Sequence, residues 1–265
     1  MLQIPVRNKL NIHVIGAGGT GGYAIENLAR LFAGDENKHT IHIYDGDVIE
    51  PKNLKRQNFT FSEIDQNKAN ALVARLNDTI HQAPELVAHD TYITSAEELM
   101  IDMISTLDTD TETLVVIMAL DNVASRRTVN EAIMDHLPQA GIPVIAIDSG
   151  NDDLGGQVVL YANASIKYQH PINGMSVGML PTMLQLYPEI DRIEDTNPGI
   201  DMSCEDNAES QPQSMMCNVR NGDVIANTLY QIYANKTISG NVWTSNSLTG
   251  VTNSTFSGFH REVTD

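Results

Sequence analysis

The segment that decides the fold is Asn11-Ile12-His13-Val14-Ile15-Gly16-Ala17-Gly18-Gly19-Thr20-Gly21-Gly22, in a chain of 265 residues. Its first five residues are mostly apolar and β-branched, as in a buried strand, and a glycine cluster ends them. A strand, a glycine turn and a helix in this order predict the first unit of a strand–helix fold. The helix is expected over residues 20–32, where apolar side chains recur at helical spacing: Tyr23, Ile25, Leu28, Leu31 and Phe32.

Strands and helices continue to alternate over the first 160 residues. Continuous apolar strands between helices are typical of a parallel sheet that is covered on both faces. We therefore predict a Rossmann-like α/β fold with a mostly parallel, doubly wound sheet. The expected strands are 41–44, 114–118 and 143–147, and the expected helices are 67–76 and 122–137.

The second half of the chain has a different pattern. Residues 157–161 predict another strand, whereas residues 165–209 are rich in Pro, Gly, Asn and Asp and predict an irregular crossover segment. Residues 215–233 could form a buried helix, although Gly222-Asp223 weakens this prediction. Residues 237–259 are dense in Ser, Thr, Asn and Gly, which favours short strands and turns. We expect these strands to form an antiparallel C-terminal extension of the sheet.

The chain is strongly acidic, with 34 acidic and 16 basic side chains and a formal net charge of −18. This balance argues against nucleic-acid binding and against a polybasic membrane patch, because both depend on Lys and Arg. No run of about 18 apolar residues appears, so no membrane-spanning helix is expected. Residues 1–7 lack the apolar core of a signal peptide, from which we expect a cytoplasmic protein. Two cysteines, Cys204 and Cys217, exclude a disulfide framework and an all-cysteine zinc site.

The glycine cluster predicts a phosphate-binding loop. Glycine lets the backbone turn sharply and lets phosphate oxygens approach the amides, while the helix N-terminus supplies oriented N–H groups. The candidate loop residues are Gly16, Gly18, Gly19 and Gly21. A tight turn without a ligand is the alternative, and the glycines alone do not separate NAD from ATP.

The second strand ends at Asp45, about twenty residues beyond the glycines, where an acidic side chain commonly binds ribose hydroxyls. The run that follows, residues 45–57 (DGDVIEPKNLKRQ), is dense in Asp, Asn, Arg and Gln. A dehydrogenase does not need such a group after its ribose carboxylate. A triphosphate site does, because Asn53 and Arg56 can bind phosphate oxygens while carboxylates serve ribose and metal.

This run, Asp-x-Asp-x-x-Glu-x-x-Asn-x-x-Arg-Gln, resembles the signature of the ThiF/MoeB superfamily of ubiquitin-activating-enzyme-like adenylyltransferases. Glycine loop, acidic strand end, Asn-Leu-x-Arg-Gln, a downstream lysine and an Asp-Asn pair recur in order from about Lys9 to Gln157. In more detail the chain is similar to the ThiF-like proteins of plasmid and phage gene clusters, including the PRTRC-system type. Cys204-Glu205 and the later Met215-Met216-Cys217-Asn218 contribute to that similarity.

The resemblance implies a role for each matching position. Asp45 would bind the ATP ribose, Asn53, Arg56 and Lys68 the phosphates, and Asp121 would orient Mg²⁺ and the triphosphate. The spacing from Arg56 to Lys68 is about one residue short of the family pattern, which suggests a small loop deletion. The same nucleotide site would include Asp47, Gln57 and Asn122.

Several side chains have simpler interpretations. Asp121 could serve only as the N-cap of the following helix, and we interpret Arg126 and Asn130 on that helix as structural. Cys217 lies in an apolar run and is expected to fill the core. The following histidines are scattered without metal-ligand spacing and are interpreted as structural or exposed: His13, His42, His81, His89, His136, His170 and His260.

The chain departs from many relatives at two points. It lacks paired Cys-x-x-Cys motifs, so no structural zinc is expected. Relatives often begin with a helix whose Arg-Gln pair enters the partner subunit's ATP site, and here Arg7 alone is a candidate. The resemblance nevertheless implies a homodimer.

The resemblance implies that MgATP adenylates the C-terminal carboxylate of a ubiquitin-like or sulfur-carrier protein, with Arg56, Lys68 and the Asp121-held Mg²⁺ as the catalytic groups. Cys204 could then form a thioester as the catalytic nucleophile of a second step. Residues 1–164 would be the ATP-binding adenylation core, and 165–265 the crossover segment and C-terminal partner-binding part of the same domain.

Three alternatives stay open at this stage. One is an NAD-dependent Rossmann oxidoreductase, which would need Asp45 but neither Lys68 nor Arg56. Another is a catalytically inactive ThiF-like scaffold. The third keeps adenylation but takes a peptide antibiotic precursor or a modified tRNA, of which the net charge disfavours tRNA.

Overall fold

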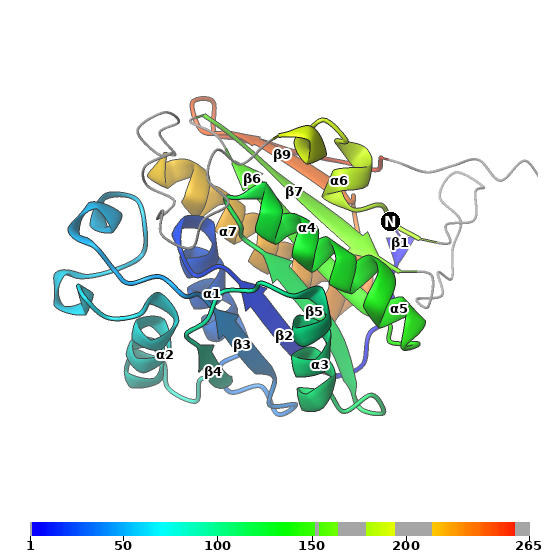
Figure 1. Ribbon diagram of the computed structural model, residues 1–265, viewed down its shortest axis with the longest axis horizontal. Helices are drawn as coiled ribbons and strands as arrows, with labels where there is room; N and C mark the ends of the chain where they lie inside the picture. Colours follow the sequence, from blue (N-terminus) through cyan, green and yellow to red (C-terminus); the bar gives the residue numbers. More distant parts are fainter. Residues whose placement is uncertain (1, 152–153, 164–178, 194–213, 258–265) are drawn as a thin grey trace, which may run out of the picture.

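The computed structural model describes residues 2–151, 154–163, 179–193 and 214–257 (Figure 1). The described residues form an eight-stranded sheet in the order β10-β9-β7-β6-β5-β2-β3-β4. The five strands from β6 to β4 are parallel, and β7, β9 and β10 join them antiparallel. The strand bounds are β2 Lys9–Ile15, β3 Thr40–Tyr44, β4 Glu85–His89, β5 Glu112–Met118, β6 Val144–Asn151, β7 Gly155–Ala162, β9 Val242–Asn246 and β10 Val251–Thr255. The predicted Rossmann-like sheet with its antiparallel extension is confirmed.

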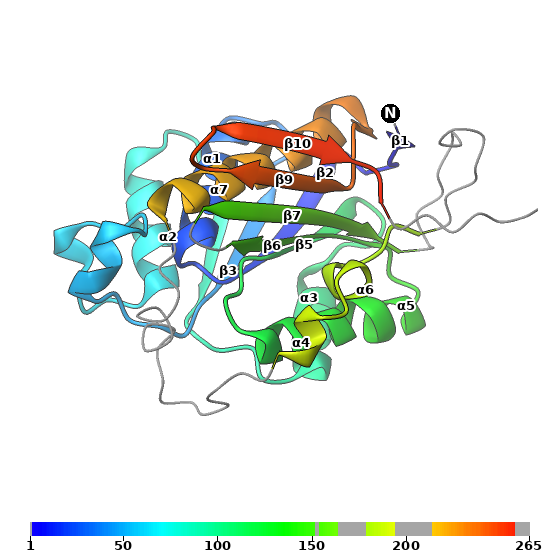
Figure 2. The same cartoon turned by 90° about the horizontal axis from the view of Figure 1, so that it is seen from above.

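Helices cover both faces of this sheet (Figure 2). One face carries α1 (Gly19–Leu31), α2 (Lys68–Thr79) and α7 (Met215–Tyr230). The other carries α3 (Ala96–Thr106) and a helical run composed of α4 (Val123–Glu131), a π-helical turn (Ala132–His136) and α5 (Leu137–Gln139). The shorter elements are β1 (Leu2–Gln3) paired with β8 (Thr237–Ile238), α6 (Met183–Leu186), a π-helical turn after α7 (Gln231–Asn235), and 3₁₀ turns at Pro51–Lys55, Phe61–Glu63 and Ile190–Arg192.

Strand β5 shows why a continuous apolar strand needs two helical layers. Val115 and Ile117 face the layer of α1 and α7, whereas Leu114, Val116 and Met118 face α3 and α4. Successive side chains of a strand point to opposite faces, so both sets are buried. Each such side chain stabilises the fold by about 1.5–3 kcal/mol.

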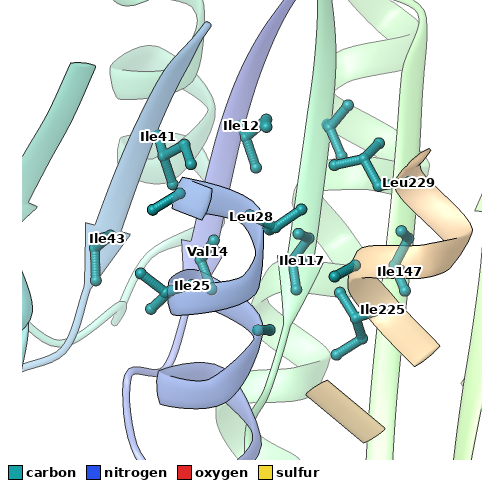
Figure 3. Packing of buried hydrophobic residues seen from close by; sticks show 14 of the residues in the cluster. Ile12, Val14, Ile25, Leu28, Ile41, Ile43, Ile117, Ile147, Ile225 and Leu229 are labelled. Carbon is teal, nitrogen blue, oxygen red and sulfur yellow. The ribbon is translucent and has the colours of Figure 1, made fainter. Parts of the chain in front are cut away.

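Helices α1 and α7 lie side by side on the sheet, although nearly two hundred residues separate them in sequence (Figure 3). Gly222 makes this contact possible, because a Cβ at this position would lie 2.8 Å from the Cβ of Tyr23. The glycine that weakened the helix prediction is therefore the point of closest approach between two helices. The apolar side chains at this contact and beneath it include Ile25, Leu28, Ile225, Leu229, Ile12, Val14, Ile117 and Ile147.

The sequence patterns missed β4 and α3, which lie between the predicted helix at 67–76 and the strand at 114–118. The predicted helix at 215–233 and the short strands after it are confirmed. Of the expected crossover segment, residues 165–209, the structure describes 179–193, which contain α6 and the 3₁₀ turn at Ile190–Arg192. Within the described ranges, no helix combines the length and the apolar character needed to cross a membrane.

Candidate functional site

The glycine loop connects β2 to α1 at the carboxyl edge of the parallel strands. Gly16 has φ +95°, and a Cβ there would lie 2.5 Å from the carbonyl oxygen of Ala119, the residue after β5. Its N–H donates to the carbonyl of Tyr44 at the end of β3, 2.8 Å away. A Cβ at Gly21 would collide with the carbonyl of Gly16. The fold itself therefore requires glycine at these two positions, as the turn interpretation expects.

Gly18 has more open surroundings, whereas a Cβ at Gly19 would lie 2.3 Å from Nδ2 of Asn218. A Cβ at Gly18 would meet only the flexible side chain of Gln57, at 3.5 Å. Gly18 is also the N-cap position of α1, and no described side chain caps this helix. The first amides of α1 are thus directed toward the loop without a side-chain acceptor, which is the arrangement that binds anions at helix N-termini.

Asp45 follows β3 and lies directly under the loop. Its carboxylate accepts the N–H of Ala17 at 2.7 Å through Oδ2 and the N–H of Asp47 at 2.9 Å through Oδ1. Burial raises the pKa of Asp45 to about 6, with Lys68 opposing this shift and Asp47 adding to it. Each oxygen has lone pairs beyond these bonds, so the carboxylate can still accept hydroxyl protons from a ligand.

Lys68 and Asp47 form an ion pair beside Asp45. Asn67 caps α2 and donates from Nδ2 to the carbonyl of Asp45 at 2.7 Å, which places Lys68 as the first residue of the helix. The ammonium of Lys68 lies 2.7 Å from Oδ2 of Asp47, with side-chain exposures of 7% and 17% respectively. The hydroxyl of Tyr92 donates to Oδ1 of the same carboxylate at 2.7 Å.

The Asn-Leu-x-Arg-Gln run forms a 3₁₀ turn that ends beside the loop. Asn53 is buried, and its Oδ1 accepts the N–H of Glu50 at 2.7 Å as part of a capping box. Arg56 is half-buried beyond the turn. Gln57 is half-buried beside Gly18, and its Oε1 has no hydrogen-bond partner among the described residues. An orphaned acceptor next to the glycine loop is a second indication of a ligand there.

Asp121 is exposed at the carboxyl end of β5. The side chain of Asn122 caps α4 by accepting the N–H of Ser125 at 2.7 Å, so the interpretation of Asp121 as the N-cap is wrong. Behind it, Arg126 is buried, pairs with Asp148 and donates to the carbonyl of Leu120 at 2.7 Å. Burial lowers the pKa of Arg126 to about 10, and the charge of Asp121 opposes this shift. The contacts of Arg126 agree with its structural interpretation.

Asn218 on α7 joins the parts of the site and was missed by sequence reasoning. It is fully buried, its Oδ1 accepts from Thr20 at 3.3 Å and from Asn151, and its Nδ2 donates to the carbonyl of Arg56 at 3.1 Å. One amide thus connects the loop helix, the 3₁₀ run and β6. Its neighbour Cys217 is buried with Sγ 2.9 Å from the hydroxyl of Ser247, in agreement with core filling. Cys204 lies outside the described residues.

Three of the scattered histidines come together on neighbouring strands. The rings of His13 and His42 stack at 4.5 Å, and Nδ1 of His42 lies 3.1 Å from Nε2 of His89. The hydroxyl of Tyr44 lies 2.9 Å from Nδ1 of His13 and also contacts Asp102. Burial lowers the pKa of all three histidines. An open pocket of about 210 Å³ adjoins this cluster and is lined by Tyr44, His89, Thr91, Tyr92, Ile93, Thr94, Ser95, Glu98, Leu99 and Asp102.

The predicted site residues that the structure describes therefore gather at the carboxyl ends of β2, β3 and β5, where parallel α/β sheets bind ligands. Gly18, Asp45, Asp47, Gln57 and Lys68 are connected by the contacts above. Asp121 lies at the end of the neighbouring strand. The described residues contain no cluster of three or more His, Cys, Asp or Glu side chains that could hold a metal ion.

Comparison with known proteins gives consistent results. Residues 6–179 match the ThiF family. Over 93 residues the chain is 29% identical to the ATP-dependent ubiquitin transferase-like protein Cap2 of Escherichia coli (strain TW11681). The aligned segment covers 35% of this chain and 16% of Cap2.

Solved structures share the fold. E. coli MccB with ATP matches with a TM-score of 0.58 and 14% identity, covering 96% of this chain and 65% of MccB. PaaA matches with a TM-score of 0.57 and 15% identity, covering 93% of this chain and 63% of PaaA. The chain thus spans less than two thirds of the length of these proteins. Because the family match extends over more than half of its residues, the chain belongs to the ThiF family.

Proposed function

We propose that the chain is an ATP-dependent adenylyltransferase that activates a carboxylate of a protein or peptide. The observation that carries this proposal is the contact between the glycine loop and the Asp45 carboxylate, with Lys68 and the Asn53–Gln57 run beside it. An NAD-dependent oxidoreductase would use the loop and Asp45 but has no role for Lys68 and Arg56. Membership of the ThiF family also favours adenylation.

ATP fits the side chains present. Asp45 would accept the ribose hydroxyls, and the uncapped amides of α1 would donate to phosphate oxygens. The orphaned Oε1 of Gln57 lies where it could accept a hydroxyl or amine proton of the nucleotide. Arg56 and Lys68 would contribute the positive charge that the triphosphate requires in an otherwise acidic chain.

The reaction requires no covalent change in the protein. A carboxylate oxygen of the substrate would attack the α-phosphorus of ATP, the bond to the bridging oxygen would break, and pyrophosphate would leave as the acyl-adenylate forms. Loop amides, Arg56 and Lys68 would stabilise the charge that develops on the phosphates. Asp121 would hold Mg²⁺, which when bound neutralises phosphate charge.

A C-terminal tail of a ubiquitin-like or sulfur-carrier protein is our proposed carboxylate. Its support is the ThiF family match and the similarity to Cap2, which is described as ubiquitin transferase-like. MccB has been solved with AMPCPP and MccA. We take a short peptide as the main alternative carboxylate substrate. Thioester transfer to Cys204 and a homodimer remain parts of the proposal.

The direct test is ATP–pyrophosphate exchange with a ubiquitin-like protein ending in Gly-Gly. We expect the exchange to need Mg²⁺ and the intact tail, because pyrophosphate is incorporated into ATP only by reaction with the acyl-adenylate of the tail. Asp45→Asn should lower the exchange rate at least tenfold, while Asp78→Asn, the same change at an exposed site on α2, should not. Exchange that persists unchanged in Asp45→Asn would contradict the proposed site. If exchange is absent with this partner but present with a short peptide, the substrate is a peptide rather than a ubiquitin-like protein.

A further inference from the structure

Tyr92 lies in the loop after β4, outside every motif that predicted the site. Its ring covers the Asp-Gly-Asp turn so closely that a Cβ at Gly46 would lie 2.6 Å from the ring. Its hydroxyl donates to Oδ1 of Asp47 at 2.7 Å, although the side chain as a whole is 53% exposed. An exposed tyrosine whose hydroxyl points back onto a carboxylate needs an explanation beyond core packing.

Asp47 connects this hydroxyl to the two groups that matter for the nucleotide. Its second oxygen binds the ammonium of Lys68 at 2.7 Å, and its N–H donates to the carboxylate of Asp45 at 2.9 Å. A carboxylate can rotate about its last torsion with little resistance. Hydrogen bonds to both oxygens remove that freedom, so the Tyr92 hydroxyl fixes the plane in which Lys68 is held.

We propose that Tyr92 is a positioning residue of the nucleotide site. Through Asp47 it holds the Lys68 ammonium at the carboxyl edge of the sheet before the triphosphate arrives. The role in turnover rests on the proposed adenylation, whereas the link from Tyr92 to Lys68 exists in the chain without nucleotide. Tyr92 and Lys68 come from separate segments, the loop after β4 and the start of α2, so their connection passes through Asp47.

The link can be measured without any substrate. The folded chain is treated with acetic anhydride, and the acetylation rate of Lys68 is read by mass spectrometry against exposed Lys55 in the same sample. Tyr92→Phe keeps the ring and removes only the hydroxyl, and it should raise the relative rate of Lys68 about tenfold. Tyr230→Phe, at another exposed tyrosine, should leave the rate unchanged. A rate in Tyr92→Phe within twofold of the wild type would overturn the proposal.

A double-mutant cycle then separates positioning from a general structural effect. If Tyr92 acts through Asp47, Tyr92→Phe should change neither the acetylation of Lys68 nor turnover in an Asp47→Asn chain. In the otherwise unchanged chain, it should lower kcat about tenfold with little change in KM for ATP, because an ammonium held in the wrong plane fails mainly in the transition state. An equal effect of Tyr92→Phe in both backgrounds would refute action through Asp47.

The two proposals fail differently. A wild-type chain that never exchanges pyrophosphate, yet shows the rise in Lys68 acetylation, would end the adenylation proposal and leave the Tyr92–Asp47–Lys68 link standing. Normal exchange with no rise in acetylation would end the positioning role and leave adenylation standing.

Discussion

The contact between Gly19 and Asn218 gives the sharpest prediction about how the second half of the chain supports the glycine loop. A Cβ at Gly19 would collide with the amide of Asn218, which is fully buried. Gly19→Ala should therefore destabilise the fold by about 2 kcal/mol, as overpacking of a dense interior usually does. The small gain in helix propensity at the first residue of α1 does not offset this cost.

Asn218→Ala acts on the same contact from the other side. It leaves the carbonyl of Arg56 and the amide of Asn151 without their partner in a buried site, which should cost about 3 kcal/mol in total. It also removes the atoms that a Cβ at Gly19 would meet. Additive effects would give the double mutant a loss of about 5 kcal/mol, whereas the shared collision predicts about 3 kcal/mol.

Urea unfolding of the four chains, followed by far-UV circular dichroism, measures this coupling directly. We expect Gly19→Ala to be nearly neutral in the Asn218→Ala background. Each 1 kcal/mol corresponds to a change in Tm of about 2–4 °C for chains of this size, so thermal melting gives an independent check. A double mutant that loses the full sum, or more, would show that α7 does not cover the loop as described.

Three further predictions concern pH and the lysine. The pKa values of His13, His42 and His89 lie below 6.5 in the fold, so the unfolded chain binds more protons as the pH falls. The free energy of unfolding should therefore decrease from pH 7.5 to pH 6. His13→Gln should reduce this dependence on pH, and a free energy of unfolding that increases over the same range would contradict the prediction. Asp45 has a pKa raised to about 6 and should bind ribose as a carboxylate, so calorimetry should show MgATP affinity falling below pH 6, up to tenfold per unit, with no such fall in Asp45→Asn. Lys68→Met should lower kcat for pyrophosphate exchange about 100-fold, and the matched change Lys55→Met should leave kcat within twofold.

Much of the fold follows from local pattern. Strands such as β5, which is buried on both faces, have apolar side chains at successive positions, and α1 has its apolar side chains on one face. The missed strand β4 is an edge strand whose five residues are only partly buried or exposed, so it lacks the apolar run by which the other strands were predicted. Gly222 made the prediction of helix α7 uncertain. A glycine is needed there because α7 packs closely against α1, which is distant in sequence.

Some residues of the candidate site could be predicted from local sequence, and others could not. Gly16, Gly21 and Asp45 follow from sequence because each meets a local demand of the strand–turn–helix unit. Asn218 and Tyr92 do not, since their partners come from distant segments that only the sheet order brings together. The three histidines also could not be grouped from the sequence, because they lie on separate strands. Parallel pairing places His13 beside His42 and Tyr44 beside His89.

We propose that the carboxyl edge of β2, β3 and β5 is an MgATP site. Thermal melting with MgATP, with NAD⁺ and with neither tests it most directly. A ligand at about 100 times its Kd stabilises the fold by about 2.7 kcal/mol, which is a shift of several degrees. We expect MgATP to raise Tm, Asp121→Ala to abolish the rise and Asp78→Asn to preserve it. A rise with NAD⁺ alone, or an equal rise with MgATP in Asp121→Ala, would show that this edge of the sheet is not the proposed MgATP site.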